Sequence, residues 1–156
     1  MCKKSHSVRR VKAADIVFVL AAILAIWGCF TFRVVRVDGD SMYPYFHDGQ
    51  ILVINTQLKA ETLQKDDVIV FETESGNSVK RIIASAGDHV VLSNGSVHIN
   101  SMRVLPYTYN GDSDAEYDLE NGQYFVIGDN YLVSYDSRDY GPVDLDIILG
   151  KVVIKF

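Results

Sequence analysis

Cysteine is scarce in this chain: 156 residues contain two, Cys2 and Cys29. Residues 33–156 contain none, so this part of the chain must fold without disulfide bonds. Neither cysteine has a histidine or a second cysteine at the spacing of metal ligands. We therefore predict no metal site, and no other pattern in the sequence calls for a cofactor.

Basic charge is also scarce after the first few residues. Residues 1–12 hold five basic side chains and no acidic one, whereas residues 33–156 hold ten basic and nineteen acidic side chains. Proteins that bind nucleic acid present a basic face to the phosphates. The acidic balance of residues 33–156 therefore argues against a nucleic-acid partner.

Between these two regions, charged residues are nearly absent. Residues 16–32 read IVFVLAAILAIWGCFTF, and the apolar character extends back to Ala13 with a single acidic residue, Asp15. A helix over 13–32 is about 30 Å long, which matches the hydrocarbon core of a bilayer. The basic residues before it outnumber Arg33 and Arg36 after it, which predicts a cytoplasmic N-terminus. We therefore expect a basic cytoplasmic tail (1–12), a transmembrane anchor (13–32) and an extracytoplasmic domain (33–156).

Two other interpretations of the apolar segment are open. A buried core helix is rarely hydrophobic on every face in so small a protein. A cleaved secretory signal would have the same basic head and apolar run, but it would end in a small-x-small cleavage pattern. Thr31, Phe32, Arg33 and Val34 follow the run instead. We favour a retained single-pass anchor, with membrane lipid as its partner.

The remainder of the chain is predicted to be mainly β. Short runs rich in valine and isoleucine alternate with turn residues, and no sustained helical period is present outside the anchor. The predicted strands are 33–38, 50–55, 68–73, 78–84, 88–92, 96–99, 124–127 and 147–154. Asn94-Gly95 predicts a tight hairpin. We expect these strands to form a folded-over or partly closed β-sheet.

One long segment is polar and acidic. Residues 106–122 (PYTYNGDSDAEYDLENG) carry acidic side chains at alternate positions. A calcium-binding loop has a comparable alternation, but its glycine stands at a different place. We interpret the segment as a solvated surface loop.

The sequence offers a serine nucleophile at Ser41, within Asp38–Pro44 (DGDSMYP). A serine hydroxyl needs a neighbouring base, most often a histidine held by a carboxylate. The histidines are His6, His47, His89 and His98. His6 lies on the cytoplasmic side, His89 and His98 alternate with apolar residues in predicted strands, and nothing fixes the orientation of His47. A histidine-based triad is therefore not favoured.

Lys80 is the alternative base. In the strand Ser78–Ile83 it lies on an apolar face, while Arg81 points to the other face and is solvated or paired. Burial disfavours the ammonium ion and lowers the pKa of a lysine, which makes a neutral amine available near neutral pH. Taken alone, the segment would also fit an exposed strand lysine.

Four motifs in this order, behind the apolar segment, resemble the type I signal peptidase family (peptidase family S26), and in particular its small Gram-positive type with one anchor. The motifs are 39–44 (GDSMYP), 67–71 (DVIVF), 80–88 (KRIIASAGD) and 128–143 (GDNYLVSYDSRDYGPV). The resemblance implies a membrane-bound serine endopeptidase with a Ser-Lys dyad. Such enzymes remove N-terminal signal peptides from exported preproteins after small-x-small (Ala-x-Ala) sites.

Carried over by motif, the resemblance implies that Ser41 is the nucleophile and Lys80 the general base. It implies that Ser134 hydrogen-bonds the lysine amine and that Asp136 and Arg138 form a supporting ion pair. The oxyanion and substrate-binding residues would be Gly39, Asp40 and Met42, with the N–H of Ser41 in the oxyanion hole. Gly39 stands where some members have a hydroxyl donor.

Three further functions stay open at this point. A non-catalytic or narrowly dedicated relative could act in the assembly of surface structures such as pili. A self-cleaving Ser-Lys repressor would require a DNA-binding domain, which the acidic chain does not favour. A plain anchored β-domain would leave the motifs after residue 127 unexplained.

Overall fold

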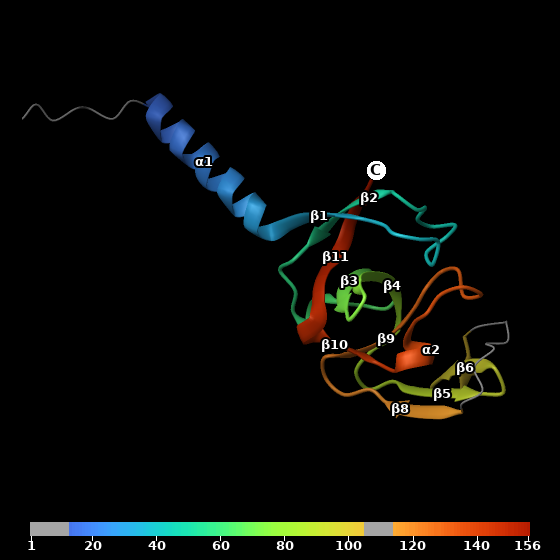
Figure 1. Cartoon of the computed structure of the whole chain (residues 1–156). Coiled ribbons are helices and arrows are strands. Elements are labelled where there is room, and N and C mark those ends of the chain that lie inside the picture. The colour runs from blue at the N-terminus through green and yellow to red at the C-terminus, as the bar shows by residue number, and fades with distance from the viewer. Residues whose placement is uncertain (1–12, 105–113) are drawn as a thin grey trace, which may run out of the picture. The chain divides into compact units, whose positions relative to one another are not determined.

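The computed structural model describes residues 13–104 and 114–156, so the predicted tail at 1–12 lies outside the described residues. The chain divides into two compact units, one ending at Thr31 and the other running from Phe32 to Phe156 (Figure 1). Each unit is described by itself below.

The first unit contains helix α1 (Ala13–Thr31), 19 residues long. Asp15 lies in its first turn, where a carboxylate is favourable beside the positive end of the helix dipole. Most of its large apolar side chains are exposed: Ile16, Val17, Phe18, Val19, Leu20, Ile23, Leu24, Trp27 and Phe30. Within the described residues, no helix meets both the length and the apolarity needed to cross a membrane. The transmembrane anchor therefore stays a prediction.

The second unit is built from two antiparallel sheets (Figure 1). The larger has seven strands in the order β1 (Phe32–Arg36), β2 (Ile51–Asn55), β11 (Ile148–Lys155), β3 (Val68–Thr73), β4 (Gly76–Ala84), β9 (Gln123–Ile127) and β10 (Val143–Asp144). The smaller has the order β7 (Met102–Arg103), β6 (Ser96–Ile99), β5 (His89–Ser93) and β8 (Ala115–Asp118). The mainly β class is confirmed. Neither sheet is closed among the described residues, and the finer description, a folded-over or partly closed sheet, stays a prediction.

Short helical turns connect the strands: α2 (Ser137–Tyr140) and the 3-10 turns Ala60–Thr62 and Leu145–Ile147. Each of the eight predicted strands overlaps an observed one. The tight hairpin at Asn94-Gly95 is also confirmed, because both residues have positive φ (49° and 68°) and join paired residues Ser93 and Ser96. Two positive φ values are what a two-residue hairpin turn of the favoured type requires.

The acidic segment 106–122 differs in part from its prediction. Residues 105–113 lie outside the described residues, but Ala115–Asp118 form β8 by pairing with β5. Ala115 and Tyr117 pack against a buried cluster under the small sheet, whereas Glu116 and Asp118 are exposed. The prediction of a loop was wrong for these four residues, because alternate acidic side chains were the solvent face of an edge strand.

Two hydrophobic clusters cover the two faces of the β3–β4 hairpin. One contains Val37, Met42, Phe46, Leu52, Ile54, Val68, Val70 and Val79. The other contains Leu63, Ile69, Phe71, Ile82, Tyr124, Val126, Val143 and Ile148. Successive side chains of a strand point to opposite faces. Lys80, which pairs with Ile69 in the register, therefore lies on the face of the second cluster.

Candidate active site

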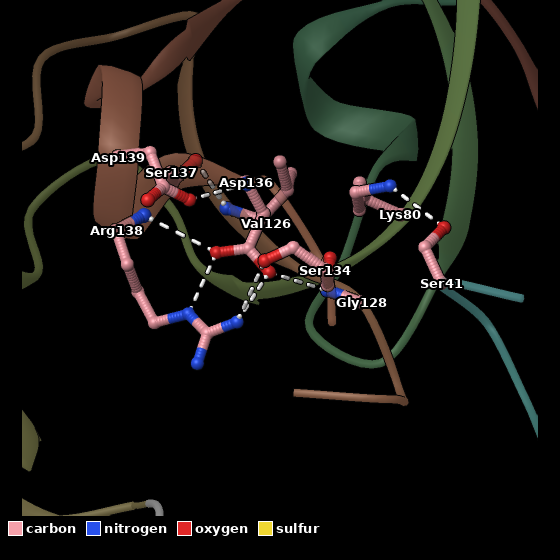
Figure 2. Close-up of polar contacts among 9 residues, drawn as sticks. All are labelled: Ser41, Lys80, Val126, Gly128, Ser134, Asp136, Ser137, Arg138 and Asp139. Carbon is pink, nitrogen blue, oxygen red and sulfur yellow. Dashed lines mark hydrogen bonds and ion pairs between the residues drawn. The ribbon is translucent and has the colours of Figure 1, made fainter. Parts of the chain in front are cut away.

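Lys80 and Ser41, 39 positions apart in the chain, meet at one point of the larger unit (Figure 2). Lys80 Nζ donates a hydrogen bond to Ser41 Oγ at 2.9 Å and another to the carbonyl oxygen of Val79 at 3.1 Å. Only 4% of Lys80 is exposed. The amine is thus held against the serine hydroxyl by a strand whose register fixes its direction.

The turn that carries Ser41 is held at both ends. Gly39, with a φ of 80°, donates its N–H to the carboxylate of Asp48 at 2.9 Å. Asn130 donates its backbone N–H to the Ser41 carbonyl at 2.9 Å and its side-chain amide to the Asp40 carbonyl at 3.1 Å. Met42 is buried in the first cluster. The buried side chain of Met42 and the hydrogen bonds from Asn130 therefore fix the position of Ser41.

The surroundings of Lys80 change its titration. Burial lowers the pKa of Lys80, and it outweighs the nearby charges. The carboxylate of Asp136 raises that pKa and the guanidinium of Arg138 lowers it. The two hydrogen-bond acceptors of the amine, a hydroxyl and a carbonyl, are uncharged. A neutral lysine amine is a base that can take the proton of a serine.

Asp136 is the centre of a buried network beside this pair (Figure 2). Its carboxylate accepts from Arg138 Nε at 2.8 Å, from a second guanidinium nitrogen at 2.9 Å, and from the N–H of Gly128 at 3.0 Å. Its own N–H donates to Asp139 at 2.9 Å, which caps the start of α2. The paired Asp136 and Arg138 side chains are almost fully buried. Because both charges are bonded, the network fixes the loop between β9 and α2.

Ser134 does not make the hydrogen bond to Lys80 that the resemblance implies. Its hydroxyl oxygen is buried and has no hydrogen-bond partner among the described residues. It nevertheless lies close to the nucleophile's turn, because a Cβ added to Gly128 would meet both Ser134 Oγ and, at 2.5 Å, the Ser41 carbonyl oxygen. Gly128 thus allows three backbone segments to approach each other.

Gly128 and Asn130 were not singled out in the sequence as site residues. Both lie in the motif 128–143, but their function depends on which distant segment packs against them. A run of small polar residues signals a loop, and does not reveal that this loop clamps the turn of Ser41. Only the juxtaposition in space identifies them.

Arg81, the residue after Lys80, lies on the opposite face. Its guanidinium binds both carboxylate oxygens of Asp129, at 2.8 and 2.7 Å, and the carbonyl of Asp66 at 2.8 Å. It also lies over the ring of Tyr45 at 4.6 Å. The hydrogen bond that Arg81 donates to the Asp129 carboxylate raises the pKa of Arg81. The prediction that this side chain is solvated or paired is settled in favour of pairing.

Among the described residues, no histidine is hydrogen-bonded to Ser41 or Lys80. His47 is exposed and makes an edge contact with the ring of Tyr43, and His89 bridges the carboxylates of Asp118 and Glu116 on the small sheet. The hydrogen bond between the His89 ring and the Asp118 carboxylate raises the pKa of His89. Within residues 13–104 and 114–156, no three His, Cys, Asp or Glu side chains group as metal ligands.

Two cavities border Ser41 and Lys80. The smaller, of about 60 Å³, has Val35, Val37, Val70 and Val79 in its wall. The larger is an open groove of about 940 Å³, with Phe71, Tyr135, Tyr140, Pro142, Val143 and Ile147 among its lining residues. A peptide bound beside the serine would therefore meet a narrow space and a wide one.

The sequence of this chain is similar to those of known proteins. The family model for signal peptidase, peptidase S26, matches residues 10–156. Signal peptidase I T of Bacillus subtilis (strain 168) is 32% identical over 171 residues, covering 99% of this chain and 88% of the relative. Signal peptidase IB of Staphylococcus aureus (strain COL) is 34% identical over 157 residues, covering 86% and 82%. A crystal structure of a signal peptidase I from Enterococcus faecalis has 24% identity and a TM-score of 0.45, covering 59% of this chain and 97% of its own.

Proposed function

Because the chain belongs to the signal peptidase family, peptidase S26, we propose that it removes N-terminal signal peptides from exported preproteins after small-x-small sites. It is a serine endopeptidase of the signal peptidase I type. The observation that carries the proposal is the 2.9 Å hydrogen bond between the buried amine of Lys80 and Ser41 Oγ.

The proposed reaction begins with transfer of the Ser41 hydroxyl proton to the neutral amine of Lys80 while Ser41 Oγ attacks the scissile carbonyl carbon. The C–N bond then breaks, and the Lys80 ammonium gives its proton to the leaving amine. A water molecule, deprotonated in turn by Lys80, hydrolyses the acyl-enzyme and regenerates the serine. The backbone N–H of Ser41 stabilises the oxyanion, with Gly39 and Asp40 shaping the turn and Met42 anchoring it.

The supporting residues act on the position and titration of Lys80. Asp136 and Arg138 influence the pKa of Lys80 in opposite directions, so the loss of either side chain would shift the pH at which the amine becomes neutral. Ser134, whose hydroxyl has no partner among the described residues, would bond the amine once the lysine moves during catalysis. We assign all three a positioning function.

The substrate would bind as an extended strand between residues 35–38 and the start of β4, by backbone hydrogen bonds. The small cavity lined by Val35, Val37, Val70 and Val79 has room for small side chains only. That volume accounts for a preference for alanine on both sides of a variable residue.

A membrane anchor completes the proposal. Helix α1 is about 28 Å long, exposes large apolar side chains along its length, and carries one acidic residue near its start. Five basic residues precede it, which favours a cytoplasmic N-terminus and an extracytoplasmic domain from residue 33 on. Membrane attachment would bring the enzyme to substrates whose own apolar segment is still in the bilayer.

The test is cleavage of a preprotein with an Ala-x-Ala site by the full chain in detergent, from about pH 6 to about pH 10. We expect cutting after the second alanine, with a rate that rises with pH as the Lys80 ammonium deprotonates. Ser41→Ala and Lys80→Arg should be inactive, because a guanidinium does not lose its proton. The exposed Lys65→Arg is the matched control and should cut normally. A folded wild-type chain that cuts nothing would overturn the proposal.

A further inference from the structure

The N–H of Ser41 is the oxyanion donor of the proposed reaction, and Gly39 places no side-chain hydroxyl beside it. Among the described residues, no protein acceptor binds this N–H. A donor stabilises an oxyanion best when it already points to the place where the negative charge develops. The direction of the Ser41 N–H must therefore be set by the structure around it.

The peptide group between Asp40 and Ser41 contains this N–H. A peptide group is planar and almost always trans, so its C=O and its N–H point in opposite directions. The contacts that hold the carbonyl oxygen of Asp40 therefore also set the direction of the Ser41 N–H. This oxygen accepts hydrogen bonds of 3.1 Å from the backbone N–H of Tyr43 and from the side-chain amide of Asn130.

Asn130 also binds the peptide group on the other side of the nucleophile. Its backbone N–H donates to the carbonyl oxygen of Ser41 at 2.9 Å. This oxygen belongs to the peptide group between Ser41 and Met42. One residue thus holds both planar groups that flank the Cα atom of Ser41. Two held planes leave the backbone dihedral angles of Ser41 little freedom.

The backbone of Asn130 is itself fixed by the loop that follows β9. Its carbonyl oxygen accepts the N–H of Val133 at 3.2 Å and the N–H of Ser134 at 3.0 Å. Gly128, in the same loop, donates its N–H to the buried carboxylate of Asp136. The side-chain amide of Asn130 therefore extends from a rigid support, as accurate positioning in catalysis requires.

From these contacts we propose that Asn130 is a positioning residue of the oxyanion hole: by holding the Asp40 carbonyl, its side-chain amide directs the N–H of Ser41 to the developing oxyanion. The inference rests on the proposed function. Asn130 acts through the Ser41 N–H and does not touch the substrate. The negative charge is on the substrate oxygen in the transition state and not in the ground state. Loss of the amide should therefore lower kcat and leave KM nearly unchanged.

Two variants remove the amide donor and keep the backbone N–H that binds Ser41. Asn130→Ala deletes the side chain, and Asn130→Asp keeps its shape but presents an oxygen that does not donate. Because Tyr43 still holds the Asp40 carbonyl, we expect kcat of Asn130→Ala to fall about 10- to 100-fold, less than the about 10²–10³-fold for loss of a whole oxyanion donor. Asn130→Asp should fall at least as far, since a carboxylate repels the carbonyl oxygen.

The matched controls are Asn121→Ala and Asn121→Asp, which make the same changes at an exposed residue. Both should keep the kcat of the wild type on a peptide with an Ala-x-Ala site. Urea unfolding of all four variants checks that each one is folded. If Asn130→Ala does not fold, Asn130→Asp, whose side chain has the same shape, carries the test.

A peptide aldehyde that ends in Ala-x-Ala distinguishes the direction of the N–H from a general change in the fold. Ser41 Oγ adds to the aldehyde carbon, the serine proton passes to Lys80, and the aldehyde oxygen becomes an oxyanion as in the transition state. The corresponding peptide alcohol has no carbonyl carbon to attack. We expect Asn130→Ala and Asn130→Asp to weaken the aldehyde by about the factor lost in kcat and to leave the Kd of the alcohol unchanged.

The outcomes separate this inference from the proposed function. A folded wild type that cleaves no Ala-x-Ala peptide refutes the proposed function. A wild type that cleaves, with both Asn130 variants equal to it in kcat and in aldehyde affinity, overturns the positioning function of Asn130 while the proposed function stands. An equal loss of affinity for the aldehyde and the alcohol also overturns it, because the residue would then support the fold or the binding of the peptide in general.

Discussion

The adjacent cations Lys80 and Arg81 lie on opposite faces of β4 and have different surroundings. Lys80 is buried and its hydrogen bonds go to uncharged oxygens, whereas Arg81 is partly exposed and binds both oxygens of the Asp129 carboxylate. Burial lowers the pKa of Lys80, whereas the carboxylate of Asp129 raises the pKa of Arg81. Strand alternation thus places a buried amine, the proposed base, next to a guanidinium that is paired with a carboxylate.

A third cation, Arg138, shows which property distinguishes Lys80 from the other two. Arg138 is as buried as Lys80, yet it is bonded to the carboxylate of Asp136 and its charge is compensated. Burial therefore does not by itself decide the function of a cation. Lys80 differs from Arg138 because its buried amine has no hydrogen bond to a carboxylate. Each of the following variants changes either this site or one of the residues around it.

Asp136→Ala should have the largest effect. It removes the carboxylate that compensates the buried charge of Arg138, a change that costs about 3–5 kcal/mol of unfolding free energy. It also removes the group that raises the pKa of Lys80, so in any folded fraction the rise of activity with pH should move to lower pH. Urea unfolding measures the first effect. Asp146→Ala, at an exposed site, should cost less than about 0.5 kcal/mol. Equal losses in the two variants would refute the structural importance of the pair.

Gly128→Ala should have the second largest effect. It should change the position of Ser41 and not the titration of Lys80. The new methyl group meets the Ser41 carbonyl at 2.5 Å, so the nucleophile's turn must shift. A displacement of about 1 Å at a reacting atom can reduce kcat/KM by about 10²-fold. Gly28→Ala is the control, because no atom lies within 4 Å of its added Cβ. Normal cleavage by Gly128→Ala would mean that the loop can yield without moving Ser41.

Lys80→Met should increase stability at neutral pH. The folded-state pKa of Lys80 is below its unfolded value of 10.5, so the buried ammonium costs stability fully at low pH. That cost falls as pH rises through the lowered pKa and disappears above 10.5, where both states are neutral. The gain from methionine should therefore shrink to nothing as unfolding is measured at increasing pH. A gain that is constant with pH would show that packing, not charge, is responsible.

Arg81→Gln should have the smallest effect. The pair with Asp129 is about one-fifth exposed on each side, and such a pair contributes about 1 kcal/mol or less. We expect that loss in urea unfolding, smaller in high salt, with the pH at which cleavage begins to rise unchanged. A shift in that pH would show that the two faces of β4 are electrostatically coupled.

Much of the fold follows from side-chain alternation. The runs of valine and isoleucine predicted the eight principal strands, and the same alternation placed Lys80 on a buried face and Arg81 on the other. The strand β8 was missed because acidic residues at alternate positions resemble a solvated loop when the partner strand is unknown.

The candidate site was less accessible to sequence reasoning. Ser41 and Lys80 could be named from residue chemistry and motif, but their approach to 2.9 Å depends on tertiary packing. The clamp by Asn130 and the close approach at Gly128 involve segments about 90 positions apart, which no local pattern encodes. The bond between Ser134 and Lys80, implied by motif, is absent from the described residues, and the functions of all these side chains stay predictions.

The position of β11 in the large sheet affects the order in which the domain folds. This strand follows all the others in the chain, yet it lies between β2 and β3. The hairpin that leads away from Ser41 and the one that carries Lys80 are therefore joined edge to edge only once residues 148–155 have entered the sheet. Contacts of such sequence separation form late, since loop closure must precede them. During synthesis, the segments that carry Ser41 and Lys80 can therefore be joined through this sheet only after residues 148–155 have been made.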